Sequence, residues 1–392
     1  MPSRYAFVSL PLGAFDSSDR EDAISSLSAT VSDNGTVQAF NVPDFKIGTL
    51  DALVQQADDL AKLESVAENV VSRVSESLSS ILGNDADRLA QYKMVNDKPT
   101  EHYINNFSWN KMRYRADKSL GELIDTLSKE LTTVDTDVKG KISQYSSVKT
   151  NLAALQRRQT GNLATKSLTP IVDPSLLVQE SEYIETHLIV VPKNVKKEFY
   201  KSYEELAPMV VPRSAIEIAT DDEFVLFGVA TFKKHSAEFI QKCREEKWTP
   251  RQYTYVQGGR EEEQRELDKV TNEERKVCGE ALRIARTGWS EAVMAWIHVM
   301  TLRVFVEAVL RYGLPLDYVT ALIKTTPKVA PKVKTALDSQ FSYLGGNAFG
   351  RDKRGKITKD DAAMSSEMAA AGLGIGEGNE YTAYVFYELE FP

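Results

Sequence analysis

The chain has 392 residues, a hydrophobic fraction of 42% and a charged fraction of 27%, which are ordinary values for a folded globular protein of two or three domains. Its formal net charge of -8 argues against a protein whose whole surface binds nucleic acid or anionic lipid, because both ligands are themselves negative. Cys243 and Cys278 are far apart and lie in helix-like stretches, which is typical of reduced thiols rather than of a disulfide framework.

The N-terminal region is predicted to contain two strands and a long helix. Residues 5–10 form a short apolar run without a cleavage signature, so we interpret it as a strand and not as a signal peptide. A polar Ser/Asp-rich loop and a second strand at residues 36–42 follow. The helix covers about residues 49–82, since Thr49 suits its start and Gly83 its end.

A loop and then a first long rod are predicted next. Residues 83–111 are expected to form a loop that its aromatic side chains anchor to a core. Those side chains are Tyr103, Phe107 and Trp109. From about residue 113 to 158, apolar residues recur at steps of three and four, which keeps a narrow seam on one side of a helix. About 45 helical residues span about 67 Å, more than the width of a compact domain.

Residues 161–257 show a different pattern, which alternates strands and helices. Strands are predicted at residues 183–191, 214–218 and 223–232, and helices at residues 194–207 and 236–248. The order strand, helix, strand, strand, helix implies a two-layer α/β sandwich around a small sheet.

The second long rod is predicted over about residues 259–311 and becomes more apolar towards its end. Residues 294–309 are the most apolar part, but His298, Arg303 and Glu307 interrupt them. No uninterrupted apolar stretch therefore reaches the length of a membrane span.

The C-terminal region is predicted to contain a helix and a final strand. A helix stop at residues 312–315 and a helix near residues 331–343 precede an alternating aromatic strand at residues 381–391. This strand needs a sheet to join, and the N-terminal strands are the expected partners. The whole pattern predicts an α+β fold.

The residues that could carry chemistry do not converge in the sequence. The histidines His102, His187, His235 and His298 lack the spacing of metal ligands, and His298 is expected to be a core or interface residue. We find no nucleophile motif, no Walker phosphate loop and no GxGxxG after a strand. The sequence therefore predicts no catalytic residue, no metal and no cofactor.

Two basic clusters and three tyrosines are the candidate partner-binding residues. One cluster lies on or near a helix of the middle segment: Lys193, Lys196, Lys197 and Lys201. The other lies near the C-terminus and includes Arg351, Lys353 and Arg354. Single lysines are usually solvated surface, but as groups they could meet acidic partner helices or filaments. For Tyr253, Tyr255 and Tyr384, packing and docking remain alternative interpretations.

Several stretches distributed through nearly the whole chain carry a resemblance to one family. They are NVPDFKIGTLD at residues 41–51, KTNLAA at 149–154, EFVLF at 223–227, TPRQYTY at 249–255, LRVFVEAVLRYGLP at 302–315 and FSYLGGNAF at 341–349. In this order they resemble the C subunit of the vacuolar-type (V-type) proton-pumping ATPases, in a form that is fungal-like in detail.

The resemblance implies an elongated dumbbell. A discontinuous foot domain would contain residues 1–112 and 312–392. A long antiparallel helical coiled-coil neck would contain residues 113–160 and 258–311, and residues 161–257 would form a small α/β head.

The resemblance also implies a function and partners. It implies a non-catalytic peripheral-stalk, or stator, subunit whose head binds a stalk made of the E and G subunits. Its foot would bind a second such stalk and the cytosolic N-terminal domain of the membrane-embedded a subunit. Family members leave the complex when the pump is switched off, and some bind actin. The chain would be cytoplasmic, and peripheral on the cytosolic face of vacuolar and other endomembranes when assembled, without membrane insertion or nucleic acid.

Two other functions stay open on the residues alone. Long helical rods also suit an actin-binding or generic coiled-coil scaffold protein. An enzyme with a site on loops is the third possibility, which the lack of converging polar motifs disfavours.

Overall fold

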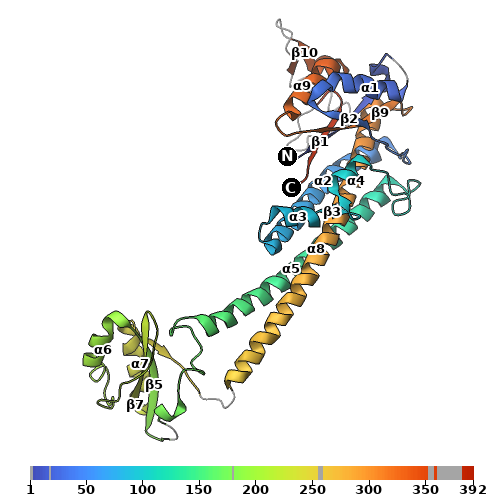
Figure 1. The fold of residues 1–392 in the computed structure, drawn as a ribbon. Coiled ribbons are helices and arrows are strands. Elements are labelled where there is room, and N and C mark those ends of the chain that lie inside the picture. The colour runs from blue at the N-terminus through green and yellow to red at the C-terminus, as the bar shows by residue number, and fades with distance from the viewer. Residues whose placement is uncertain (1–2, 17–18, 179–180, 255–258, 352–356, 360–381) are drawn as a thin grey trace. The chain divides into compact units, whose positions relative to one another are not determined.

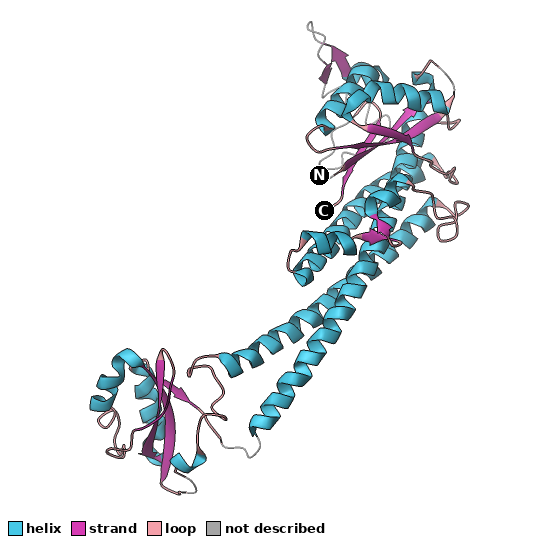
Figure 2. Cartoon of the chain, viewed as in Figure 1, coloured by secondary structure: helices cyan, strands magenta, loops and turns pink. Residues whose placement is uncertain are grey.

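The computed structural model describes residues 3–16, 19–178, 181–254, 259–351, 357–359 and 382–392, and it mixes helices with several sheets (Figures 1 and 2). The chain divides into two compact units. Unit 1 contains Met1–Ile142 and Glu280–Pro392, and unit 2 contains Ser143–Gly279. The mixed fold class is confirmed, whereas the dumbbell and its division into foot, neck and head stay predictions.

A four-stranded antiparallel sheet joins the two ends of the chain in unit 1. Its order is β12 (Val385–Glu390), β1 (Arg4–Pro11), β9 (Tyr318–Thr325) and β2 (Thr36–Ala39). Phe7 of β1 lies opposite Tyr387 of β12. The prediction that the terminal strand pairs with an N-terminal strand is therefore confirmed.

Both faces of this sheet are buried. Along β1, Tyr5 and Phe7 pack into one hydrophobic core, while the alternate residues Ala6 and Val8 pack into a second core with the helices α1 (Arg20–Val31) and α9 (Ala330–Phe341). Burial on both faces explains why β1 and β9 are continuous apolar runs.

Two parts of this sheet region differ from the prediction. α1 replaces most of the predicted Ser/Asp-rich loop: Asp19 caps it by accepting a hydrogen bond from the Glu21 N–H, and Ala23 and Leu27 are buried on one face. The helix was difficult to predict, because serines surround its few apolar residues and serine is also common in loops. The central strand β9 was not predicted, because its apolar run does not alternate.

Three long helices pack together in unit 1: α2 (Leu50–Leu82), α5 (Leu120–Thr160) and α8 (Gly259–Tyr312). Thr49 caps α2 by accepting from the Ala52 N–H, and Gly83 ends it with a φ of 70°. α5 begins at Leu120, later than the predicted start near residue 113.

Short elements replace most of the predicted loop at residues 83–111. They are α3 (Ala86–Tyr92), β3 (Met94–Val95), β4 (Lys98–Pro99) and α4 (Thr100–Asn105). The aromatic anchor is confirmed, since Trp109 is buried in the core and Tyr103 and Phe107 pack against it. A separate two-stranded antiparallel sheet contains β10 (Phe349–Arg351) and β11 (Ile357–Lys359).

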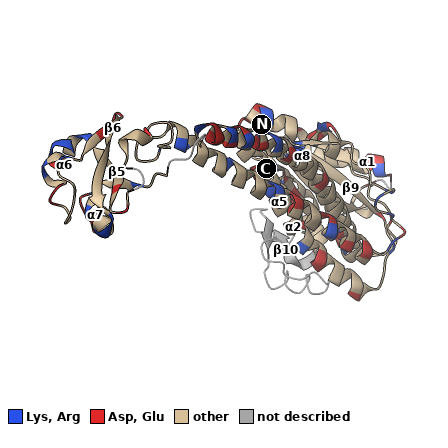
Figure 3. Cartoon of the chain, turned by 90° about the horizontal axis from the view of Figure 1, so that it is seen from below, with Lys and Arg blue, Asp and Glu red and all other residues tan. Residues whose placement is uncertain are grey.

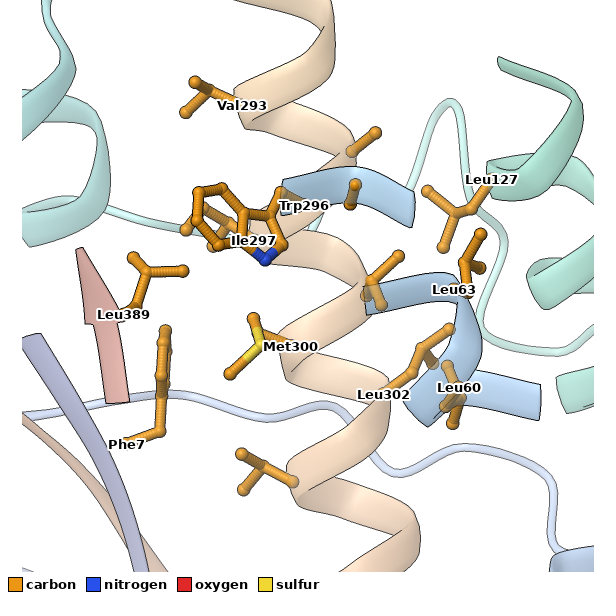
Figure 4. Packing of buried hydrophobic residues seen from close by; sticks show 14 of the residues in the cluster. Phe7, Leu60, Leu63, Leu127, Val293, Trp296, Ile297, Met300, Leu302 and Leu389 are labelled. Carbon is orange, nitrogen blue, oxygen red and sulfur yellow. The ribbon is translucent and has the colours of Figure 1, made fainter. Parts of the chain in front are cut away.

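The C-terminal half of α8 is buried on nearly all sides (Figure 4). Trp296, Ile297 and Met300 pack among side chains of α2, α5 and the sheet, including Leu60, Leu127 and Phe7. By length and composition α8 could cross a membrane, because its most apolar window has a mean hydropathy of 1.7, but 78% of that window is buried inside the protein. A helix that is apolar all round is expected in a core.

Unit 2 contains a second four-stranded antiparallel sheet. Its order is β6 (Ile216–Thr220), β7 (Phe224–Phe232), β5 (Ile184–Pro192) and β8 (Thr249–Arg251). The helices α6 (Lys196–Ser202) and α7 (Ser236–Glu245) cover one face, and residues 163–172 cover the other. The predicted order of strands and helices is confirmed, while the three-residue strand β8 was missed.

At Gly288, α8 lies close to α5 and α2. A Cβ atom at this position would lie 2.7 Å from Val138 Cγ2 of α5 and 3.9 Å from Val74 Cγ2 of α2. Gly279, in the same helix, is exposed and would meet nothing within 4 Å. We therefore expect Gly288→Ala to lower the free energy of unfolding by about 1–2 kcal/mol, because the overlap outweighs the gain in helix propensity.

Gly279→Ala is the matched control. It should raise the free energy of unfolding by up to about 1 kcal/mol, since it gains propensity without overlap. Urea unfolding followed by circular dichroism measures both values. Equal effects of the two substitutions would show that close helix packing does not select glycine at position 288.

His298 is a core residue of α8, as expected. Its Nδ1 lies 2.6 Å from the Met294 carbonyl oxygen, and the Asn110 N–H donates to its Nε2 over 3.2 Å. This pattern assigns the neutral tautomer that carries its proton on Nδ1. Burial is the main cause that lowers the pKa of His298 to about 4 from an ordinary 6.5.

The lowered pKa predicts an acid-sensitive stability. Above pH 6.5 the imidazole is neutral in both states. As the pH falls from 6.5 towards 4, only the unfolded chain binds the proton, so the free energy of unfolding should fall by up to about 3 kcal/mol. His298→Gln keeps an acceptor but cannot titrate, so the stability difference between wild type and variant should shrink over this range. A difference that is constant with pH would contradict the assignment.

Candidate partner-binding surfaces

The four lysines of the first basic cluster lie together on unit 2. Lys193 follows β5 directly, and its backbone N–H donates to the Glu223 carbonyl oxygen over 2.9 Å. Lys197 and Lys201 are exposed one helical turn apart on α6. Lys196 instead forms an ion pair, since its Nζ lies 2.6 Å from Glu217 Oε2 of β6. Exposed positive charge is therefore concentrated on Lys193, Lys197 and Lys201.

The core of unit 2 fixes which face of α6 carries these lysines. Phe199 is fully buried, and its ring stacks on Phe227 of β7 at 4.4 Å between centroids. Because Phe199 faces the sheet, Lys197 and Lys201 project from another side of the helix. In Figure 3, Lys and Arg positions are coloured blue along the α6 ribbon.

An exposed aromatic side chain lies next to the lysines. Tyr200 is 44% exposed and is close enough to Lys196 to raise its pKa together with Glu217, which is the main cause. We call Tyr200, together with Lys193, Lys197 and Lys201, the α6 surface. A mixture of cations and exposed apolar groups is typical of a surface that binds an acidic amphipathic partner.

The second basic cluster stays a prediction. Arg351 ends β10, whereas Lys353 and Arg354 lie outside the described residues. Tyr255 also lies outside them. Tyr253 is partly buried against Leu163 and other residues on the second face of the unit 2 sheet, which is consistent with the packing interpretation.

Tyr384 lies in the core of unit 1, between the sheet and α9. Its side chain is fully buried, and its hydroxyl donates to Asp338 Oδ1 over 2.9 Å. Burial and the neighbouring carboxylate raise the pKa of Tyr384. Tyr384 therefore packs in the core, which is one of the two interpretations that the sequence left open. A partner cannot reach its side chain.

A cavity of about 350 Å³ in unit 1 was not predicted. Its lining comes from the start of α1, the end of β2 and the start of β9, three segments that are distant in the sequence. No motif links them, so only the sheet topology brings them together.

Among the described residues no group of three or more His, Cys, Asp or Glu side chains could hold a metal ion. The α6 surface stays a candidate surface for docking onto a larger assembly.

Comparisons with known proteins identify that assembly. A family model that describes the C subunit of V-ATPase matches residues 5–385, so the chain belongs to the V-ATPase C-subunit family. The C subunit of the V-type proton ATPase of Saccharomyces cerevisiae is 38% identical over 90% of this chain and 88% of that protein. The protein of the same name from Manduca sexta is 35% identical over 89% and 88%, and the V-type proton ATPase C 1 subunit of Xenopus laevis is 34% identical over 93% and 92%.

A solved structure of a cytoplasmic N-terminal domain aligns with 87% of this chain and 97% of that chain. The domain belongs to the I subunit, a homolog of the a subunit of V-ATPase. The sequence identity is 13% and the TM-score is 0.32. A likeness this low carries no argument about fold or partners.

Proposed function

We propose that this chain is a non-catalytic peripheral-stalk subunit of a vacuolar-type proton-pumping ATPase. The observation that carries the proposal is the family match over residues 5–385, together with relatives that align over about nine tenths of both chains. In this proposal the middle segment binds one stalk made of the E and G subunits. The segments at the two termini bind a second such stalk and the cytosolic N-terminal domain of the membrane-embedded a subunit.

A mechanical role follows from what a rotary pump requires. A rotor can do work only if the rest of the complex resists its torque, so a stator must hold the stalks and the membrane sector in register. α8 is one continuous helix of 54 residues, and α5 is one of 41 residues. Long helices that enter both units support the idea of a spacer with binding surfaces at its ends.

Reversible assembly requires that each contact between the stator and its partners contribute only a small binding free energy. Exposed charge pairs suit this need, because each contributes little and weakens as salt rises. The α6 surface carries three exposed lysines and one partly exposed aromatic side chain, Tyr200, which supports a charge-assisted contact with the E and G stalk. We propose that the chain works on the cytosolic face of vacuolar and other endomembranes and leaves that face when the pump disassembles.

The double variant Lys197→Glu with Lys201→Glu tests this assignment. Two reversed charges at one surface should weaken binding to a purified heterodimer of the E and G subunits by at least about tenfold. The affinity of the wild type should also fall more steeply with salt than that of the variant. Isothermal titration calorimetry at several salt concentrations measures both effects.

Lys233→Glu with Lys234→Glu provides the matched control. These exposed lysines follow the end of β7. Because Pro192 pairs with Phe224, the end of β5 that leads into α6 lies beside the start of β7, so Lys233 and Lys234 lie at the other end of the sheet from α6. The control should keep near wild-type affinity. Equal loss in both double variants would show that only the net charge of unit 2 matters, and no loss in either would remove the α6 surface from the proposed contact.

An actin-binding or generic scaffold function is the second candidate. The same exposed lysines on α6 support it, because acidic filaments attract basic surfaces. Co-sedimentation with actin filaments, compared with co-purification with the proton pump, distinguishes the two functions.

A further inference from the structure

β2 leaves one edge of the unit 1 sheet open. The Phe40 N–H donates to the Thr320 carbonyl oxygen over 2.9 Å, and Ala39 lies opposite Ala321. Hydrogen bonding alternates along an antiparallel pair, so the backbone groups of Val37, Ala39 and Asn41 point away from β9. In the part of the chain that the structure describes, no backbone group pairs with this outer edge.

This edge is short, because β2 has four residues, but no charged side chain protects it against pairing. Residues 34–43 carry no charged side chain, although 27% of the whole chain is charged. Natural proteins normally place lysine, proline or a bulge on an open edge, because an unprotected edge pairs with other strands. Here the length of β2 and Pro43, which lies beyond the strand, limit the edge. An edge of this kind is suited to accept another strand.

The cavity of about 350 Å³ opens beside the same edge. Ala39 and Asn41 of the edge line it, together with Phe40, Ile24 of α1 and Tyr318 of β9. The Phe40 ring packs on Phe7 and Phe107, so the partly buried Ile24 of α1 is the apolar side chain of the lining that lies on the α1 side of the sheet. A volume of this size is large enough for a bulky apolar side chain and part of its backbone.

Charge at the cavity favours a basic occupant. Its charged lining residues are one cation, Arg20, and two anions, Glu21 and Asp44. Glu21 and Asp22 also make the first turn of α1 acidic. Burial chiefly raises the pKa of the Tyr318 hydroxyl, and the nearby Asp44 carboxylate raises it further.

We propose that the β2 edge and its cavity bind an extended segment of another polypeptide. The segment pairs with the outward N–H and C=O of Ala39 and places one large apolar side chain in the cavity. A lysine or arginine beside that side chain lies near Glu21 and Asp44. Main-chain pairing supplies affinity and the cavity supplies specificity, as in other cases of strand addition.

A second copy of this chain is a poorer occupant. If two β2 edges paired, each would offer the other Val37 and Ala39, and these side chains are too small to fill the cavity. The proposal is independent of the partners assigned to the α6 surface, which lies in unit 2.

A synthetic peptide tests the proposal on the full-length protein. The probe is a fluorescein-labelled heptapeptide, Thr-Lys-Val-Leu-Val-Lys-Thr, whose leucine and two lysines share one face when it is extended. We expect saturable binding by fluorescence polarisation. The same peptide with glycine in place of leucine should bind at least about tenfold more weakly, since it leaves the cavity empty.

Two variants locate the binding site. Ala39→Pro removes the outward N–H without breaking a bond to β9, so it should weaken leucine-peptide binding by about fivefold or more, whereas Ala39→Ser keeps the N–H and the affinity. Ile24→Trp should abolish binding by filling the cavity. Thermal unfolding checks that each variant is folded.

Three results would overturn the proposal. They are the lack of saturable binding of the leucine peptide to the wild type, equal affinity for wild type and folded Ala39→Pro, and self-association of the wild type that Ala39→Pro abolishes. The last result would assign the edge to a second copy of the chain.

Discussion

The burial of the C-terminal half of α8 is the constraint on which unit 1 depends. This helix packs on α2, α5 and the terminal sheet at the same time. Each of these elements therefore buries apolar side chains against α8. Its buried charged residues form ion pairs: Arg303 pairs with Glu64 of α2, and Arg311 pairs with Glu307. Arg303 also lies 4.2 Å from the ring centroid of Tyr387 in β12. Charge and apolar packing thus tie the C-terminal strand to the same helix.

Much of this architecture could be predicted, because periodicity records which faces are buried. The seam of α5, the caps of α2 and the terminal strand all leave local signals in the sequence. Hydrophobic periodicity does not predict an element that is buried on both faces or that has only a short apolar stripe. β9 is apolar on both faces and so does not alternate, and α1 shows its short apolar stripe among serines. α5 was predicted to begin too early, because the segment before Leu120 is polar and helix-compatible but is not helical.

The candidate sites were predicted less completely than the fold. The grouping of Lys193, Lys197 and Lys201 follows from helical spacing, but the engagement of Lys196 by Glu217 depends on a strand that pairs across the sheet. The place of Tyr384 depends on α9, whose Asp338 accepts its hydrogen bond. The cavity beside β2 depends on three segments that only the sheet brings together. Sequence spacing reports contacts along one element, whereas these sites arise between elements.

The proposed stator role needs surfaces that bind different partners and a spacer that transmits load between them. The α6 surface, in unit 2, and the β2 edge, in unit 1, are chemically distinct: one is basic, and the other is an open strand beside an acidic cavity. Different chemistry at the two surfaces favours different partners, which is what a bridge requires.

Amine-reactive cross-linking of the intact proton pump, with the linked peptides identified by mass spectrometry, tests this bridging claim most directly. We predict that Lys197 and Lys201 cross-link to the E or G polypeptide of one stalk. Lysines of unit 1 should cross-link to the membrane-embedded a polypeptide, which unit 2 should not contact. Cross-links of Lys197 or Lys201 to the a polypeptide, or no cross-link between unit 1 and the a polypeptide, would contradict the claim.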